Sequence, residues 1–179
     1  MRYTTSCNSP AGELCLAASE KGLTGLWLAE QKYFAAGLPM DTVEQKDYPM
    51  LVQAVDWLES YFAGAKPNIQ DLKLHPFGSP FRQEVWKRLC EIPYGEVTTY
   101  GALAKAMAKA AGKEKMSSQA VGGAVGHNPI SIIIPCHRVI GSNGSLTGYA
   151  GGIKNKIYLL EHEDVDTSGF FVPEKGTAL

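Results

Sequence analysis

The chain has 179 residues and a formal net charge of -1, and this length allows one ordinary domain or two small ones. Hydrophobic residues make up 45% and charged residues 20%, which excludes a disordered chain, a collagen-like repeat and a coiled coil. No apolar run approaches the ~20 residues that cross a bilayer, and the N-terminus lacks the apolar stretch of a secretory signal. We therefore expect an intracellular protein without a membrane span.

The four cysteines contain no CxxC pair, so neither a disulfide framework nor a standard zinc site is expected.

The charges are unevenly distributed along the chain. Residues 1–80 carry a net charge of -3, residues 81–163 carry +4, and residues 164–179 carry -2. The basic second half would suit a polyanionic partner, or it is an ordinary surface with scattered lysines. The charges alone leave both interpretations open.

The first half predicts short strands followed by one helix. Strands are expected at residues 2–7, 13–19 and 23–28, and the turn formers between them favour an antiparallel meander. Asp47 is the expected N-cap of a helix that Gly64 ends. The aromatic and cysteine side chains of this half are interpreted as packing residues: Tyr48, Trp57, Tyr61, Phe62, Cys7 and Cys15.

The second half begins with predicted helices. One begins at residues 79–80, the next is capped by Thr98 or Thr99 and runs to about Ala111, and the third is capped by Ser117 or Ser118. Because a short polar turn at residues 112–116 joins the last two, they are a candidate helix-turn-helix.

The remaining elements predict a wing and a closing helix. The apolar run 130–134 suits a buried strand that Pro135 ends. The Asn-Gly pair at 143–144 predicts a hairpin between residues 139–140 and 145–147, and this completes a winged helix-turn-helix. A final amphipathic helix carries Ile153, Ile157 and Leu160 on one face, and a loosely ordered tail follows it.

Cys136 and His137 are the first candidates for chemistry. An apolar setting keeps a thiol protonated unless a base or a positive group favours the thiolate, and His137 is the nearest base. Neighbouring residues of an extended chain point in opposite directions, so proton transfer between them needs a turn or an intervening water. Glu163 could hold the histidine. On these residues alone, a buried structural cysteine beside a surface histidine is the alternative.

The third predicted helix is unusually rich in glycine. Residues 119–126 include three glycines, each of which costs ~1 kcal/mol in a helix interior. Either the helix packs closely against another helix, or its backbone approaches another molecule, such as a DNA minor groove.

These features together resemble one known family. Pro135-Cys136-His137-Arg138-Val139, with Gly122-Gly123-Ala124 and Asn128-Pro129 before it and Tyr149-Ala150-Gly151-Gly152 and His162-Glu163 after it, is similar to the 6-O-alkylguanine-DNA alkyltransferases. This family is also called the methylated-DNA-protein-cysteine methyltransferases. The resemblance covers residues 81–163 closely. It implies an α+β protein with an N-terminal ribonuclease-H-like domain at 1–75, a linker at 76–80, a winged-helix domain at 81–163 and a tail at 164–179.

The resemblance also implies a role for each residue of the site. Cys136 would accept the alkyl group, His137 would take its proton through a water, Glu163 would orient His137, and Asn128 would brace the turn. The Tyr100 hydroxyl would donate to the flipped guanine, the carbonyls of Cys136 and Val139 would hold its exocyclic amine, and the Ala150 amide would bind the damaged oxygen. Tyr149 would also belong to the substrate-binding site. The DNA-contacting helix would contribute Ser118, Gln119, Ala120, Gly122 and Gly123.

The implied partner is double-stranded DNA carrying alkylated guanine, with alkylated thymine as a further candidate. The protein would act as a monomer in the cytoplasm, or at the nucleoid if the source is prokaryotic, and would need no metal or cofactor. Two features depart from the family pattern. Gln119 stands where an arginine is common, and the turn within residues 106–116 is longer. No counterpart of the zinc ligands of some members is found.

The chemistry predicts a single turnover. A thiolate that takes an alkyl group from guanine becomes a thioether, which water does not hydrolyse, whereas a thioester intermediate would be hydrolysed. A thiol hydrolase or amidase using Cys136, His137 and Glu163 is an alternative, and repeated turnover of an ester would favour it. A noncatalytic lesion-binding protein is a third hypothesis, and the presence of Cys136 argues against it.

Overall fold

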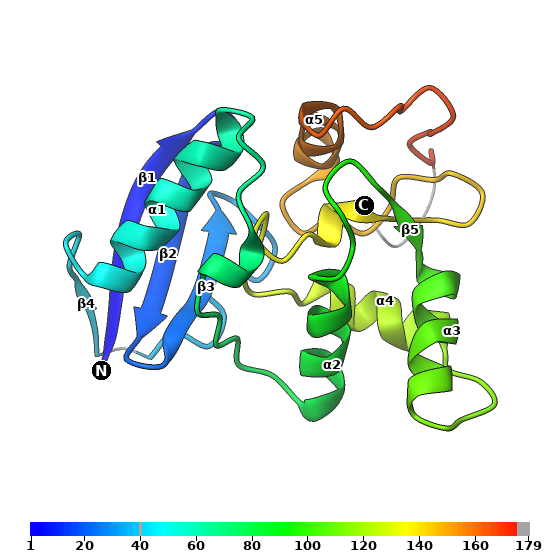
Figure 1. The fold of residues 1–179 in the computed structure, drawn as a ribbon, viewed down its shortest axis with the longest axis horizontal. Coiled ribbons are helices and arrows are strands. Elements are labelled where there is room, and N and C mark those ends of the chain that lie inside the picture. The colour runs from blue at the N-terminus through cyan, green and yellow to red at the C-terminus, as the bar shows by residue number, and fades with distance from the viewer. Residues whose placement is uncertain (40, 175–179) are drawn as a thin grey trace. The chain divides into compact units, whose positions relative to one another are not determined.

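The computed structural model describes residues 1–39 and 41–174. The described residues form two compact units, which Figure 1 shows in ribbon form. The first contains Met1–Phe77 together with Pro129–Ile133, and the second contains Gly78–Asn128 and the chain from Ile134 onward. No helix in the described residues is long and apolar enough to cross a membrane.

The N-terminal unit is built on a mixed sheet in the order β3-β2-β1-β4. Its strands are β1 (Arg2–Ser9), β2 (Gly12–Ser19), β3 (Gly22–Leu28) and β4 (Thr42–Glu44). The pairs β1–β2 and β2–β3 are antiparallel, which confirms the predicted meander. The short strand β4 pairs parallel with β1 and was not predicted. Gly22 is required at the turn into β3, because its φ is +144° and a Cβ there would lie 2.3 Å from the Lys73 carbonyl oxygen.

Helix α1 (Pro49–Phe62) lies across one face of this sheet and contacts β1, β2 and β3 (Figure 1). Trp57 and Tyr61 are buried and stack with their ring centroids 5.6 Å apart, and Tyr48 and Phe62 are half-buried, so their interpretation as packing residues is confirmed. The predicted N-cap Asp47 is wrong. Tyr48 occupies that position without a side-chain capping bond, since Pro49 at the first helical position leaves one N–H fewer to satisfy. A short 3-10 helix, η1 (Ile69–Asp71), follows.

The predicted helices of the second unit are confirmed. They are α2 (Pro80–Leu89), α3 (Tyr100–Ala110) and α4 (Ser118–Gly126), and their N-caps are Ser79, Thr99 and Ser117. In each case the side-chain oxygen of the N-cap accepts a hydrogen bond from a backbone N–H of the first turn. Helix α4 contacts both α2 and α3, and the Trp86 indole of α2 donates to the Ala124 carbonyl at 2.9 Å.

The predicted strand at residues 130–134 is wrong, although the segment is buried as expected. Ile130 forms an isolated bridge with Leu26, after which the chain turns and Ile132 adopts a φ of +68°. The Ile133 and Cys136 amides donate to carbonyls two residues before them instead of to a neighbouring strand. The turns lead into the 3-10 helix η2 (Cys136–Arg138).

The predicted hairpin forms its turn but not its second strand. The Gly141 amide donates to the Ser145 carbonyl at 2.8 Å, which closes the turn. Strand β6 (Val139–Ile140), however, pairs parallel with β5 (Thr98–Thr99), so residues 145–147 are left outside the ladder. The Leu146 amide instead donates to the Phe171 carbonyl.

Helix α5 (Ile153–His162) is confirmed, and Leu160 packs in a cluster with Ile140 and Leu146. Val165 and Phe170 pack against the same cluster, so this part of the tail is held in place, contrary to the prediction of a loosely ordered tail. Residues 175–179 of the predicted tail lie outside the described residues.

Candidate active site

Cys136 lies at the start of η2, where Pro135 turns the chain after the buried segment. The Asn128 side-chain amide donates to the Ile134 carbonyl at 2.8 Å and to the Cys136 sulfur at 3.1 Å. One side chain therefore fixes both the turn and the thiol. Burial raises the pKa of the Cys136 thiol, and the Asn128 hydrogen bond and the positive charge of Lys156 partly offset this increase.

His137 is fully buried, and its Nε2 lies 2.7 Å from Oε1 of Glu163, the residue that follows α5. Burial lowers the pKa of His137, while the contact with Glu163 opposes this effect. Because Nε2 is held by the carboxylate, Nδ1 is the nitrogen left to accept a proton, and it has no hydrogen-bond partner among the described residues. The alternative of a surface histidine beside a structural cysteine is therefore wrong.

Arg138 completes this cluster and was not identified from the sequence. Its Nε donates to Glu163 Oε2 at 2.7 Å, its Nη2 to Oε1 at 3.0 Å, and its Nη1 to the Ile92 carbonyl at 2.6 Å. Burial acts to raise the pKa of Glu163, but the hydrogen bonds from His137 and Arg138 outweigh it and hold this pKa well below its usual range. Arg138 is visible in the Pro-Cys-His-Arg-Val motif, yet nothing in the motif indicates that it shares a carboxylate with His137.

Tyr100, the first residue of α3, lies close to Cys136. Its hydroxyl donates to the Thr147 carbonyl at 3.0 Å, and burial together with the nearby thiol raises its pKa to about 12. Gly148 is required next to it, because its φ is +71° and a Cβ would lie 2.8 Å from the Tyr100 hydroxyl oxygen.

The remaining predicted pocket residues lie between η2 and α5. The Val139 carbonyl accepts a hydrogen bond from the Lys156 ammonium at 2.6 Å. The buried Tyr149 ring lies edge-on to His137 with the centroids 6.4 Å apart, and Ala150 is half-buried in the turn before α5. Lys156, a fully buried residue of α5, was missed. In the sequence of an amphipathic helix, nothing distinguishes it from a lysine on the solvent-exposed face.

The predicted DNA-contacting residues lie on α4, away from the cysteine turn in sequence. Ser118, Gln119 and Ala120 form its exposed first turn, Gly123 is exposed, and Gly122 is half-buried. A Cβ at Gly123 would meet no atom within 4 Å, and at Gly122 it would make only ordinary contact with the Tyr100 ring. Close packing within the chain therefore does not require a glycine at either position.

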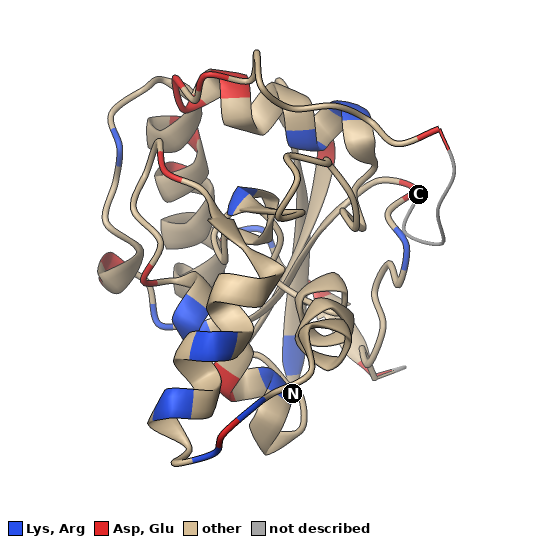
Figure 2. Ribbon diagram, turned by 90° about the vertical axis from the view of Figure 1, so that its right-hand side faces the viewer, with Lys and Arg blue, Asp and Glu red and all other residues tan. Residues whose placement is uncertain are grey.

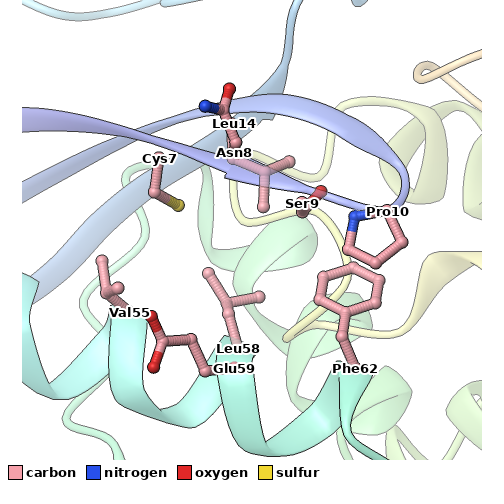
Figure 3. Close-up of a pocket in the computed structure, with 9 residues that line it drawn as sticks. All are labelled: Cys7, Asn8, Ser9, Pro10, Leu14, Val55, Leu58, Glu59 and Phe62. Atoms are coloured by element: carbon pink, nitrogen blue, oxygen red, sulfur yellow. The ribbon is translucent and has the colours of Figure 1, made fainter.

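A second thiol lies in a pocket of the N-terminal unit and differs from this site. The pocket has a volume of about 210 Å³ and lies between the β1–β2 turn and α1 (Figure 3), lined by Cys7, Asn8, Ser9, Pro10, Leu14, Val55, Leu58, Glu59 and Phe62. Burial and the charge of Glu59 raise the pKa of the Cys7 thiol. These lining residues include no histidine and no cation, and the negative charge of Glu59 disfavours a thiolate, so the described pocket does not activate its cysteine.

Comparison with known proteins agrees with this arrangement. The family model of the 6-O-methylguanine DNA methyltransferase ribonuclease-like domain matches residues 1–76, and that of the DNA binding domain matches residues 80–165. A Methanosarcina barkeri protein named methylated-DNA--protein-cysteine methyltransferase is 46% identical over 162 residues, which are 90% of this chain and 97% of the relative. The chain belongs to the 6-O-methylguanine DNA methyltransferase family.

Solved structures of other family members agree in fold. The crystal structure of Mycobacterium tuberculosis OGT in complex with DNA matches with a TM-score of 0.78 and 43% identity, covering 90% of this chain and 93% of that one. The Mycobacterium tuberculosis O6-methylguanine methyltransferase matches with a TM-score of 0.76 and 44% identity, covering 91% and 93%. This methyltransferase-family chain therefore has the predicted α+β fold, with a ribonuclease-like sheet and helix before a helical DNA-binding domain.

Proposed function

We propose that this protein repairs DNA by transferring a methyl or other alkyl group from the 6-oxygen of guanine to the thiol of Cys136. One observation carries the proposal: a buried thiol held by Asn128 adjoins a buried His137–Glu163 pair, within the unit that the DNA-binding family model matches. The names of the relatives and the solved complex of one of them with DNA support the same reaction. The transfer restores guanine and inactivates the protein.

The reaction begins with removal of the thiol proton. His137 accepts it at Nδ1 through a water, while Glu163 holds the other ring nitrogen and stabilises the imidazolium. The sulfur then forms a bond to the alkyl carbon as the bond from that carbon to the guanine oxygen breaks. The electron pair of the broken bond passes to guanine. The Tyr100 hydroxyl, which donates to the Thr147 carbonyl in the unbound chain, changes partner and donates a hydrogen bond to the leaving base.

Guanine recognition uses backbone groups around the same turn. The carbonyls of Cys136 and Val139 accept from the exocyclic amine, and the Ala150 amide donates to the damaged oxygen. Tyr149, buried against His137, forms an apolar wall. The alkylated oxygen is inaccessible within a base stack, so the nucleotide is flipped into the pocket.

Helix α4 supplies the DNA contact. Its first turn and glycine face enter the minor groove, with contacts from Ser118, Gln119, Ala120, Gly122 and Gly123. Gln119 fills the space that the flipped nucleotide leaves. The exposed lysines of α3 and of the turn after it, seen as basic bands in Figure 2, contact phosphates.

We also propose how the chain is organised around this reaction. Residues 1–75 form the N-terminal domain, 76–80 the linker, 81–163 the domain that binds DNA and accepts the alkyl group, and 164–179 the tail. The protein acts as a monomer, in the cytoplasm or at the nucleoid of a prokaryotic source.

Intact-mass measurement after incubation with a duplex carrying O6-methylguanine tests the function. The wild type should gain one methyl group per chain, and peptide mapping should place it on Cys136. Cys136→Ala should gain none and still bind the duplex. Methylation that appears first on Cys7, Cys15 or Cys90, or repeated hydrolysis of an ester without a stable adduct, would contradict the proposal.

A further inference from the structure

The segment Pro129–Ile133 groups with the N-terminal unit, although the chain on either side of it belongs to the unit that holds Cys136. The Pro129 carbonyl accepts a hydrogen bond from the Leu26 amide at 2.8 Å, and the Leu26 carbonyl accepts one from the Ser131 amide at 2.9 Å. Strand β3 therefore sets the path of this segment. The reaction described above gives the segment no role.

Both ends of the segment lie in the candidate site. Asn128 precedes it and Ile134 follows it. The Asn128 side-chain amide donates to the Ile134 carbonyl at 2.8 Å and to the Cys136 sulfur at 3.1 Å. The segment thus leaves the site at Asn128 and returns at the hydrogen-bond partner of the same side chain. A change in its path would move the donor away from the sulfur.

The segment returns to the site through a strained turn. The Ile133 amide donates to the Ser131 carbonyl at 2.7 Å, which closes a γ-turn centred on Ile132. Ile132 has a φ of +68°, a conformation that a β-branched residue rarely adopts and that costs free energy. Such a conformation persists only where the surrounding contacts enforce it. Contacts of the residues that flank Ile132 are therefore needed to hold the turn.

The Ser131 side chain supplies one of these contacts through Gln31. Its hydroxyl donates to Gln31 Oε1 at 2.9 Å, and the same oxygen accepts from the Leu28 amide at 3.1 Å. Gln31 is 5% exposed and Ser131 is 1% exposed, so both ends of the bond are buried. Loss of the acceptor would leave a buried hydroxyl without this partner, which is costly. Gln31 thus fixes the first residue of the strained turn to the end of β3.

We propose that Gln31 and Ser131 are positioning residues for Cys136. Their hydrogen bond holds the γ-turn at Ile132, and this turn keeps the Asn128 amide on the sulfur. The two residues act through the backbone and touch neither DNA nor guanine. The inference rests on the proposed function, because the position of the thiol matters only if Cys136 is the nucleophile. A donor that is held in place before the reaction need not be reorganised as the thiolate forms.

Loss of this support should also change the titration of the thiol. The Asn128 hydrogen bond lowers the pKa of Cys136 against the effect of burial, so a displaced amide should raise this pKa. Variants of Gln31 or Ser131 leave the titratable and charged groups around the thiol unchanged. These groups belong to α3, η2, the turn before α5, α5 and the residue after it: Tyr100, His137, Arg138, Tyr149, Lys156 and Glu163.

The test measures the rate at which iodoacetamide alkylates Cys136 in the full-length protein as a function of pH, by mass spectrometry of the Cys136 peptide. The sulfur–carbon bond forms as iodide leaves and the thiol proton passes to the buffer, so neither DNA nor guanine is needed. Ser131→Ala removes the donor, and Gln31→Met removes the acceptor. Each should react about tenfold more slowly near neutral pH, with the midpoint of the profile moved to higher pH.

Two further variants separate positioning from stability. Because Gln31 and Ser131 act through one hydrogen bond, Gln31→Met/Ser131→Ala should react no more slowly than the slower single variant. Thr24→Val is the matched control, since it removes another buried hydroxyl of the same sheet, which donates to the Ala17 carbonyl at 3.2 Å. The control should react at the wild-type rate, although urea unfolding should show a loss of stability comparable to that of Ser131→Ala.

Three outcomes would overturn the inference. Wild-type rates in folded Ser131→Ala and Gln31→Met would mean that the bond only stabilises the N-terminal unit. Slowing that multiplies in the double variant would show that the two residues act separately. Equal slowing in Thr24→Val would show that the thiol responds to any loss of stability.

Ser131→Ala keeps the inference testable if Gln31→Met does not fold. It deletes one oxygen atom and leaves the bond from the Leu28 amide to Gln31 in place, so its rate then decides alone. Failure of the proposed function is detected separately, because it would appear as wild-type protein that gains no methyl group from DNA in the intact-mass measurement.

Discussion

Glu163 receives hydrogen bonds from both His137 and Arg138, and this sharing determines where the proton of the thiol can go. The Arg138 guanidinium is always charged and makes two bonds to the carboxylate, so Glu163 stays ionised. The proton therefore remains on the imidazole, which the carboxylate stabilises. Since burial lowers the pKa of His137, the ring is neutral at rest and available as a base.

Glu163→Gln should strongly destabilise the protein. The amide leaves the buried Arg138 charge without a carboxylate, and breaking a buried ion pair in this way costs about 3–5 kcal/mol. Urea unfolding would measure the loss, with Glu161→Gln as the control at an exposed position of α5. The double variant Glu163→Gln/Arg138→Met should recover part of the stability, because it removes both charges. A loss as small as that of the control would show that the ion pair is not stabilising.

The contribution of Glu163 to stability should disappear in acid. An unfolded glutamate has a pKa of ~4.3, and the folded pKa lies below this value, so the unfolded state binds more protons between the two. The stabilisation is therefore complete above about pH 5 and is lost progressively as the pH falls through the folded pKa. The difference in unfolding free energy between wild type and Glu163→Gln should be smaller at about pH 3.5 than at about pH 6. An equal difference at both values would contradict this assignment.

At the scale of elements, helix α4 contains glycines that lower its stability, and one of them lies on an exposed face. Gly123 lies in its interior and is exposed, and no neighbouring atom requires the absence of a side chain there. Each interior glycine costs ~1 kcal/mol relative to alanine. The helix is thus less stable than its fold permits, which is expected where function needs a bare backbone.

Gly123→Ala should make the protein more stable but less active on duplex DNA. The added methyl group meets nothing within the chain, so the unfolding free energy should rise by up to ~1 kcal/mol. The same group stands on the face that is proposed to enter the minor groove, so methyl transfer from a duplex should slow. Thermal unfolding and single-turnover rates would measure the two effects. A stabilised variant with an unchanged duplex rate would show that α4 does not approach DNA through this face.

Gln119→Arg should accelerate transfer from duplex DNA. Flipping a nucleotide costs a few kcal/mol of unstacking, and a planar cation at the exposed start of α4 would offset more of this cost than an amide does. The rate with the free base O6-benzylguanine should barely change, because no flipping is needed. Comparing both rates in both proteins separates the causes. Equal acceleration with the free base would instead indicate a change in the Cys136 pocket.

At the scale of the whole molecule, charge is divided between the two halves of the chain. Residues 81–163 carry ten Lys and Arg against six Asp and Glu, whereas residues 1–80 carry six against nine. Four basic side chains of α3 and the turn that follows it are all exposed: Lys105, Lys109, Lys113 and Lys115. This distribution favours contact with a polyanion through the C-terminal half alone.

Binding to undamaged DNA should be weak, nearly independent of sequence and sensitive to salt. Each phosphate neutralised by a lysine or arginine releases counter-ions, so the logarithm of the affinity should fall linearly with the logarithm of the salt concentration. Fluorescence anisotropy with a labelled duplex would measure the slope. Lys105→Gln/Lys109→Gln should make it shallower, and Lys32→Gln/Lys46→Gln in the N-terminal half should not. An affinity that stays constant as salt rises severalfold would contradict a DNA surface in the basic half.

The sequence by itself determined the features that depend on neighbouring residues. A helix start at residues 79–80 was predicted, with caps at Thr98 or Thr99 and at Ser117 or Ser118 for the next two helices. The structure has Ser79, Thr99 and Ser117 as caps, because each satisfies an amide of its own first turn. The meander followed from the turn formers between short strands, and the pairing of His137 with Glu163 from the chemistry that a thiol needs. These predictions are confirmed because their physical causes act over a few residues or through one recognisable motif.

The tertiary structure alone decided the features that depend on the path of the chain. The apolar run 130–134 indicated burial correctly, but burial does not specify hydrogen bonding. Only one bridge, between Ile130 and Leu26, joins the run to a strand, and the Ile133 amide is satisfied within a turn. Likewise, the Asn-Gly pair indicated the turn but did not specify the partner of the strand before it, and β6 pairs with β5 instead of with residues 145–147. In the sequence, Arg138 and Lys156 look like surface charges. In the structure, Arg138 binds the Glu163 carboxylate and Lys156 binds the carbonyls of Val139 and Thr147. They become buried partners because η2 and α5 bring them together around Cys136.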